Sequence, residues 1–186
     1  MKAIPLLLII LTLTSFVPLP EDCGSERWKV KTVTDNVQIK FSSPISRSIT
    51  QLRMVIRPIK VGKQADRFPF EKNVVTTTGN IVYYKGEDDK DLHVVIQTGK
   101  KNMIIEFPDV TCDAMSRSPV VDDATKAKAD FLKIVAGKPK DQFFEGIPVR
   151  VKGVAFFDIN HGEPGQIGHA PNNMELHPVL SISLAH

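Results

Sequence analysis

The sequence predicts a mainly β protein with one α-helix inserted among its strands. Runs rich in β-branched and aromatic residues predict strands, and a change to helical spacing between Asp122 and Gly137 predicts a helix after the third of them. With 186 residues, of which 42% are hydrophobic and 24% charged, the chain has an ordinary globular composition. We therefore expect one folded domain over residues 73–186. The five predicted strands are 74–85, 92–96, 103–107, 147–158 and 174–184.

Residues 1–20 have the pattern of a secretory signal peptide. Lys2 precedes a short apolar run, 4–17, and no further charge occurs before Glu21. This run is shorter than the about 20 apolar residues of a transmembrane helix, and an uncleaved N-terminal anchor is the alternative. We expect an exported protein, periplasmic or secreted, with no membrane span after signal cleavage.

Residues 21–72 are expected to form an extended N-terminal arm and a connecting loop. The segment 24–32 alternates weakly and contains the only tryptophan, Trp28. Ser48 has the character of an N-cap and predicts a short helical turn after it. Prolines and a glycine then indicate a loop over 56–70.

The chain contains two cysteines, Cys23 and Cys112. An oxidising compartment favours disulfides, and an even number of cysteines needs no outside partner. A Cys23–Cys112 disulfide would tie the arm to the middle of the domain and contribute about 4 kcal/mol of chain entropy. Two unpaired or intermolecular thiols are the alternative.

The strand predictions rest on the alternation of apolar and polar residues and on the turn-forming residues that end each run. The first strand contains Gly79 and ends at an acidic turn, Glu87–Asp91, where solvated carboxylates are the expectation and a calcium site is the alternative. The next two strands end at a Gly-Lys turn and at Pro108. The fourth alternates around Gly153, and glycines within strands indicate bulges or tight coiling. In the last strand we expect four aliphatic residues on one face and Glu175 and His177 on the other. Those four residues are Leu176, Leu180, Ile182 and Leu184.

The order of three strands, one helix and two strands resembles the OB-fold, a five-stranded and partly open Greek-key barrel. The resemblance covers roughly residues 73–184. It implies a five-stranded OB-like β-barrel with one helix between strands three and four. It also implies that the loop between the last two strands lies at the end of the barrel that often binds ligands.

Four short motifs resemble a group of uncharacterised small exported bacterial proteins. They are Cys23-Gly-x-Glu-Arg-Trp28-x-Val-Lys-Thr32, Leu92-His93, Phe107-Pro-Asp-x-x-Cys112 and His169-Ala-Pro-Asn-x-x-Glu-Leu-His-Pro-Val179. This resemblance implies export and a bacterial source, and it links the two cysteine-containing motifs. It implies no catalytic residues.

The candidate site is the long loop 159–173 together with the strand faces beneath it, because long loops within compact domains are more often functional. Histidine nitrogens and carboxylates here suit a divalent metal, with His161, His169, His177 and Glu175 as candidate ligands. Their spacing matches no established metal motif, so histidines that hydrogen-bond to the loop backbone are the alternative. The wider set of candidate ligand-binding residues is His93, His161, His169, Asn172, Asn173, Glu175 and His177.

These features predict a ligand-binding or envelope-associated module, and the alternative is a metal-dependent hydrolase of the phosphodiesterase or nuclease type. The partners considered are single-stranded nucleic acid, an oligosaccharide and an envelope protein. A formal charge of +3 is too small to favour nucleic acid by itself. The residue types that would suit binding across the barrel face are Tyr83, Tyr84, Phe156, Arg150 and Lys152, although aromatic residues on strands are usually buried.

Overall fold

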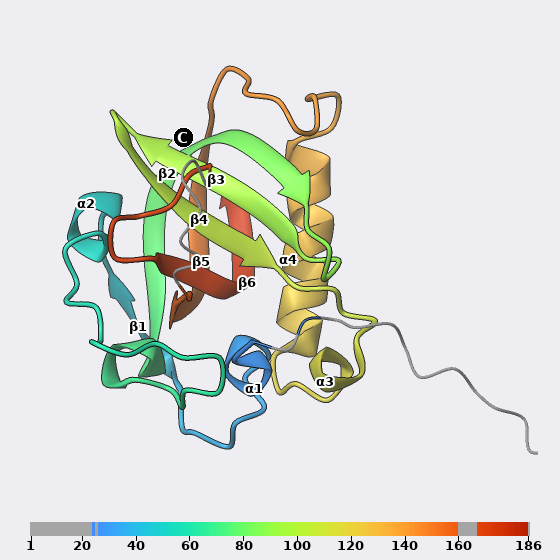
Figure 1. The fold of residues 1–186 in the computed structure, drawn as a ribbon. Helices are drawn as coiled ribbons and strands as arrows, with labels where there is room; N and C mark the ends of the chain where they lie inside the picture. Colours follow the sequence, from blue (N-terminus) through green and yellow to red (C-terminus); the bar gives the residue numbers. More distant parts are fainter. Residues whose placement is uncertain (1–23, 25, 160–166, 186) are drawn as a thin grey trace, which may run out of the picture.

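The computed structural model describes residues 24, 26–159 and 167–185, and it shows a mixed sheet of six strands (Figure 1). The strand order is β1-β2-β3-β4-β6-β5, and β2 also pairs with β5. The predicted mainly β class is confirmed. The predicted signal peptide 1–20, Cys23 and His161 lie outside the described residues. The strands are β1 (Lys40–Ser46), β2 (Asn73–Gly86), β3 (Leu92–Thr98), β4 (Lys101–Phe107), β5 (Ile147–Phe157) and β6 (Met174–Leu184).

Short helical segments connect these strands. The structure contains α1 (Trp28–Lys31), α2 (Ile49–Leu52), the 3-10 helix η1 (Pro69–Lys72), α3 (Asp113–Ser116) and α4 (Val121–Ile134). Two helices, not one, therefore separate β4 from β5. Ser48 caps α2 through a capping box with Gln51, as the sequence predicts. In the described part of the chain, no helix has the length and apolar character needed to cross a membrane.

The expectation of exactly five strands preceded by an extended arm is wrong in two places. Residues 28–31 form the helical turn α1, which buries Val30. The strand β1 adds to the sheet in parallel with β2, with Lys40 opposite Asn73 and Ile45 opposite Val75. The strand gave no sequence signal because almost all its residues are exposed and Pro44 interrupts it.

Bulges in β6 change which side chains share a face. Lys152 pairs with Ser181 and Gly153 pairs with Val179, so Leu180 is an extra residue between two paired positions. Leu180 consequently packs in a different cluster from Leu176, and the predicted single aliphatic face is wrong. A Cβ on Gly153 would lie 2.9 Å from Leu176 Cβ, which explains the glycine at this close approach.

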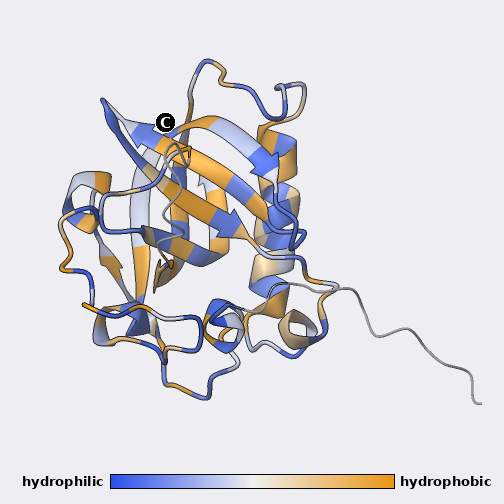
Figure 2. Cartoon of the chain, in the orientation of Figure 1, coloured by the Kyte–Doolittle hydropathy of each residue, from blue (hydrophilic) through white to orange (hydrophobic). Residues whose placement is uncertain are grey.

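The core lies between the sheet and α4. Phe131 of α4 stacks on Phe107 at the end of β4 with a ring-centroid distance of 4.7 Å, and it meets Tyr84 of β2 edge-on at 5.5 Å. Figure 2 shows long hydrophobic stretches along β3 and β4. Since β3 and β4 are buried along most of their length, polar residues on them are largely shielded from solvent.

A buried ion pair fixes the N-terminal segment to the domain. Arg27 donates to both carboxylate oxygens of Glu71, at 2.7 and 2.8 Å, and to the carbonyl oxygen of Phe157 at 2.7 Å. It also donates to the carbonyl oxygens of Ala65 and Asp66. Neither side chain of the pair is exposed. Arg27 thereby holds α1 beside the end of β5.

Candidate metal and ligand site

A pocket of about 650 Å³ lies where the N-terminal segment, the β2–β3 turn and the strands β3, β4 and β6 meet. Its lining is predominantly ionisable, which is unusual because charged side chains are seldom buried without partners. The ionisable residues that line it are Glu26, Lys31, Lys85, Glu87, Asp88, Asp89, His93, Glu106, Asp158, His169 and Glu175.

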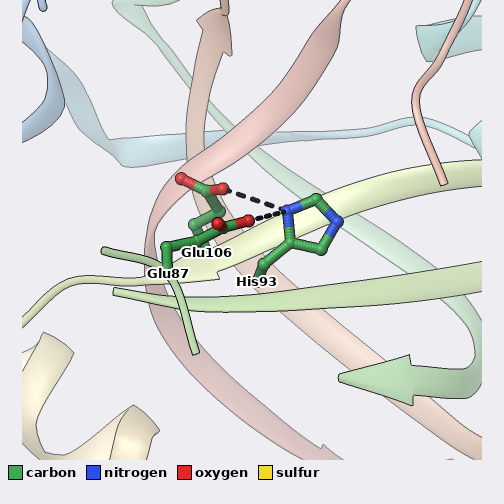
Figure 3. Close-up of side chains that lie close together, drawn as sticks. All are labelled: Glu87, His93 and Glu106. Atoms are coloured by element: carbon green, nitrogen blue, oxygen red, sulfur yellow. Dashed lines mark ion pairs between the residues drawn. The ribbon is translucent and has the colours of Figure 1, made fainter. Parts of the chain in front are cut away.

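Three of these side chains converge on one point. The antiparallel pairing of β3 and β4 places His93 directly opposite Glu106, and the turn after β2 brings in Glu87. His93 Nδ1 lies 3.2 Å from Glu87 Oε1 and 3.5 Å from Glu106 Oε1. Figure 3 shows both carboxylates directed at the same ring nitrogen. The other ring nitrogen, Nε2, lies 3.0 Å from the carbonyl oxygen of Ile167.

The spacing of these three groups suits a bound metal ion. One ligand atom from each of Glu87, His93 and Glu106 lies within 4.8 Å of the others. Ligands at about 2.0–2.2 Å from a tetrahedral zinc ion are separated from one another by roughly 3.3–3.6 Å. The ion-pair distances of 3.2 and 3.5 Å around His93 are close to that separation.

The second oxygen of Glu106 is held from behind by His177. His177 Nδ1 lies 2.7 Å from Glu106 Oε2, and its Nε2 lies 3.6 Å from Asp91 Oδ2. The parallel pairing of β4 with β6 brings these strands together, and His177 is fully buried. Asp91 is anchored in turn by accepting the backbone N–H of Asp109 at 2.8 Å. This chain of contacts orients Glu106, as outer partners commonly orient metal ligands.

Electrostatics make the three converging groups charged at neutral pH. Burial opposes the charged form of His93, but Glu106 and Glu87 outweigh it and raise the pKa of His93 to about 9. Burial also opposes ionisation of Glu87, yet His93 and Lys85 hold its pKa below the usual value. The same balance at Glu106, with Lys31, His177 and His93 as the favourable neighbours, holds its pKa well below the usual value.

Glu175 shows that the pocket has an excess of negative charge. It is 2% exposed, and its Oε2 has no hydrogen-bond partner among the described residues. Burial and then the carboxylates of Glu106 and Asp158 raise the pKa of Glu175 well above its usual value. A cation that entered the pocket would favour its ionised form.

Lys31 is the buried cation of the site. Its Nζ lies 3.9 Å from Glu106 Oε2 and 3.9 Å from Asp89 Oδ2. Burial lowers the pKa of Lys31, but Glu106, Asp158 and Glu175 outweigh that effect and raise it. One lysine does not balance the charge of the surrounding carboxylates. The neighbouring Asp91 shows this, because burial, together with Asp89 and Glu106, raises its pKa to about 7.

The structure brings together some of the residues that the sequence nominated. His93, His169 and Glu175 line the pocket, and the His93 and His169 ring centroids are 6.0 Å apart. His177 does not line the pocket and lies behind Glu106. Together with Asp91 and Glu106 it forms a second group whose potential ligand atoms lie within 4.8 Å of one another, so its role as a metal ligand stays a prediction. The predicted ligand His161 lies outside the described residues.

The two asparagines have structural contacts. Asn172 Nδ2 donates to the carbonyl oxygens of Leu52 and Val55, each at 2.9 Å. Asn173 adopts a φ of 51° and donates from Nδ2 to the carbonyl oxygen of Ile159. Both residues therefore hold the loops in place, and neither lines the pocket, so their ligand-binding role stays a prediction.

The proposed aromatic binding face is also corrected. Tyr83 is 5% exposed, Phe156 is fully buried, and Tyr84 packs against the core. Tyr83 and Phe156 therefore offer no face to a base or a sugar, and Tyr84 is half-buried. Of the two cations predicted for this face, Arg150 is exposed and Lys152 is half-buried.

The acidic turn is more than a solvated hairpin tip. Glu87 contacts Lys85 at 2.9 Å as well as His93, and Asp91 is 1% exposed. The sequence offered this turn only as an alternative calcium site, and it missed Glu106 and Lys31 as site residues. Strand register was the available signal, because the predicted hairpin of 92–96 with 103–107 already places His93 across from Glu106.

Cys112 is buried in the second core cluster, against which Trp28 also packs. No cysteine of the described residues is free. Because Cys23 lies outside those residues, the Cys23–Cys112 pairing stays a prediction.

No family model matches the chain, and no curated protein matches it. Among solved structures, a protein described as an aspartyl-tRNA synthetase from Leishmania major is 13% identical with a TM-score of 0.44, over 78% of this chain and 21% of that one. An asparaginyl-tRNA synthetase from Entamoeba histolytica is 10% identical with a TM-score of 0.37, over 60% and 20%. The complex of that enzyme with asparaginyl-adenylate is 13% identical with a TM-score of 0.38, over 76% of this chain and 24% of that one. The chain spans about a fifth to a quarter of these proteins, and such low scores indicate nothing about its function.

Proposed function

We propose that this protein is a ligand-binding module whose pocket holds a divalent metal ion on Glu87, His93 and Glu106. The observation that carries the proposal is the convergence of one imidazole and two carboxylates, from separate positions along the chain, within 4.8 Å of one another. Three protein ligands leave a fourth coordination position, which would face the pocket and accept water or a ligand group. An imidazole with carboxylates suits zinc or manganese better than calcium.

The charge balance of the pocket supports a cationic occupant. Its lining contains seven carboxylate residues and two lysines, and burial together with the neighbouring carboxylates of Glu106 and Asp158 raises the pKa of Glu175 well above its usual value. A divalent ion would relieve this repulsion. It would also displace the proton from His93, since only the neutral imidazole binds a metal.

We further propose that β2 to β6 form an OB-like arrangement. Its support is the closed series of pairings β2–β3, β3–β4, β4–β6, β6–β5 and β5–β2, with α3 and α4 between β4 and β5. In this arrangement β1 is an addition at the edge of β2. Export remains part of the proposal and rests on the signal-like sequence of residues 1–20.

The test is a thermal melt of the oxidised protein with EDTA, followed by zinc, manganese, calcium and magnesium in turn. A site saturated at 100 times its dissociation constant adds about 2.7 kcal/mol, which corresponds to a shift in Tm of several degrees. We expect zinc or manganese to raise the Tm. The replacement Glu87→Gln should remove the shift, whereas the matched change Glu145→Gln, at an exposed residue outside the pocket, should keep it. Equal melting curves with every metal would refute the proposed site.

Metal-assisted hydrolysis is the second candidate function, and the state of Glu175 favours it. Glu175 lines the same pocket as the proposed ligands, and its raised pKa suits a group that exchanges a proton with a reacting substrate as a general acid or base. Turnover of bis(p-nitrophenyl) phosphate by the metal-loaded protein would be lost in Glu175→Gln while the metal-induced Tm shift persisted. If the metal shift occurs without any turnover, the protein is a binding module alone.

A further inference from the structure

The loop between α2 and η1 exposes three large aliphatic side chains. Met54 is 75% exposed, Ile56 is 91% exposed and Ile59 is 101% exposed, so each is about as accessible as in an isolated peptide. In Figure 2 this loop alternates hydrophobic and hydrophilic segments. Such a concentration of exposed aliphatic side chains on one short loop differs from the scattered apolar residues of an ordinary surface.

The same part of the chain is strongly basic. Residues 36–65 contain no aspartate or glutamate, although the whole chain has 21 of them against 24 lysines and arginines. Lys63 is paired with Glu26, which lies outside this stretch, at 2.6 Å. Arg53 and Arg57 donate to the uncharged carbonyl oxygens of Asn102 and Asp158 and so keep their net charge, and Lys60 is exposed. The basic residues of the stretch are Lys40, Arg47, Arg53, Arg57, Lys60 and Lys63.

The base of the loop is fixed, so its tip is presented to the outside. Buried Asn172 donates to the carbonyl oxygens of Leu52 and Val55, and Val55 packs against the core. Arg57 donates from Nη2 to the carbonyl oxygen of Asp158 at 2.9 Å. Val61 also packs inward. The outward direction of Ile56 and Ile59 is thus imposed by contacts on both sides of them.

We infer that residues 53–63 form a membrane-surface site that binds anionic lipid headgroups and inserts Met54, Ile56 and Ile59 into the bilayer interface. Basic residues next to exposed aliphatic side chains are the combination that interfacial membrane binding uses. Three exposed aliphatic side chains on one short loop suit a deformable lipid surface better than a protein interface, which needs about 800 Å² on each partner. The inference is independent of the metal site.

The experiment is cosedimentation with vesicles of phosphatidylcholine alone or of phosphatidylcholine mixed with phosphatidylglycerol, in EDTA so that metal binding plays no part. We expect binding to the mixed vesicles, weaker binding to neutral ones, and loss of binding as salt rises. The double replacement Ile56→Ser/Ile59→Ser should reduce the partition coefficient by on the order of tenfold or more. Lys60→Glu should weaken binding to the mixed vesicles and leave binding to the neutral vesicles unchanged.

The matched control is Leu132→Ser/Phe143→Ser, which removes two exposed apolar side chains elsewhere, at 50% and 63% exposure. It should bind as the wild type does. Absence of wild-type binding, or equal binding by Ile56→Ser/Ile59→Ser, would overturn the inference. Gel filtration that showed self-association lost in Ile56→Ser/Ile59→Ser, without vesicle binding, would make the loop an interface between copies of the chain instead.

Discussion

At the scale of single residues, the buried charges form two groups that differ in how well they are paired. Arg27 and Glu71 satisfy each other, and the remaining bonds of both go to backbone groups such as the N–H and C=O of Phe157. Glu175 and Asp91 instead each keep an oxygen without a hydrogen-bond partner among the described residues. The first group is structural. In the second, Glu175 lines the pocket and Asp91 lies behind it next to His177, and burial raises the pKa values of both carboxyl groups.

Replacing Arg27 by Met is expected to lower the free energy of unfolding by about 3–5 kcal/mol, because Glu71 would remain buried without a cation. Urea unfolding followed by circular dichroism measures this loss. Replacing Glu71 by Met as well should not restore stability, since backbone groups that now bond to the pair would be left unsatisfied. The exposed control Arg150→Met should change stability by less than about 0.5 kcal/mol. A double variant as stable as the wild type would contradict this account.

Residue type alone predicted only part of the site. His93 and Glu175 could be nominated because histidines and carboxylates near a long loop suggest ligands, and both line the pocket. Glu106 and Lys31 could not be found in the same way, because their role depends on strand register and on the position of α1. His177 contacts Glu106 from behind the pocket, and its role as a ligand stays a prediction.

At the scale of elements, long periodic segments were predictable and irregular ones were not. The alternation and β-branched content of β2 to β5 predicted those strands within a few residues. The bulges of β6 and the exposed strand β1 depend on contacts that are distant in sequence, so local pattern gave no sign of them. The α4 helix begins at Val121 instead of after Asp122, and Asp122 and Asp123 lie in its first turn, where the helix dipole favours them.

The bulge of β6 depends on Gly153. Gly153→Ala should lower the free energy of unfolding by about 1–3 kcal/mol, because the new Cβ would meet Leu176 Cβ at 2.9 Å and the carbonyl oxygen of Pro178 at 3.0 Å. Gly62→Ala is the matched control, since no atom lies within 4 Å of its Cβ position. Thermal or chemical melts compare the two variants. Equal stability would show that β6 moves freely at this point.

At the scale of the whole molecule, the buried ionisable groups predict a stability that falls on both sides of a mildly acidic optimum. His93 has a pKa of about 9, so its contribution is complete below about pH 6.5 and is lost as the pH rises through 9. Asp91, with a pKa of about 7, favours the folded state most below about pH 3.8 and loses this contribution as the pH rises through 7. The lowered pKa values of Glu87 and Glu106 act oppositely and cost stability below about pH 4.5.

The metal-free protein should therefore lose roughly 2–3 kcal/mol through His93 alone between pH 6 and pH 9.5. Melts across this range in EDTA measure the loss. His93→Gln should flatten the profile above pH 6.5, whereas Asp91→Asn should flatten it between about pH 4 and pH 7. A profile of the wild type that rises with pH above 6.5 would contradict the proposed charge states.

Calorimetric titration with zinc at pH 7.5 tests directly whether Glu87, His93 and Glu106 hold a divalent ion. Titrations in two buffers of different ionisation enthalpy report the number of ions bound and the number of protons released together. We predict one ion per chain and the release of at least one proton, because His93 is protonated before the metal binds. We also predict that both signals vanish in a folded His93→Gln variant. No binding by the wild type, or unchanged binding and proton release in His93→Gln, would contradict the account.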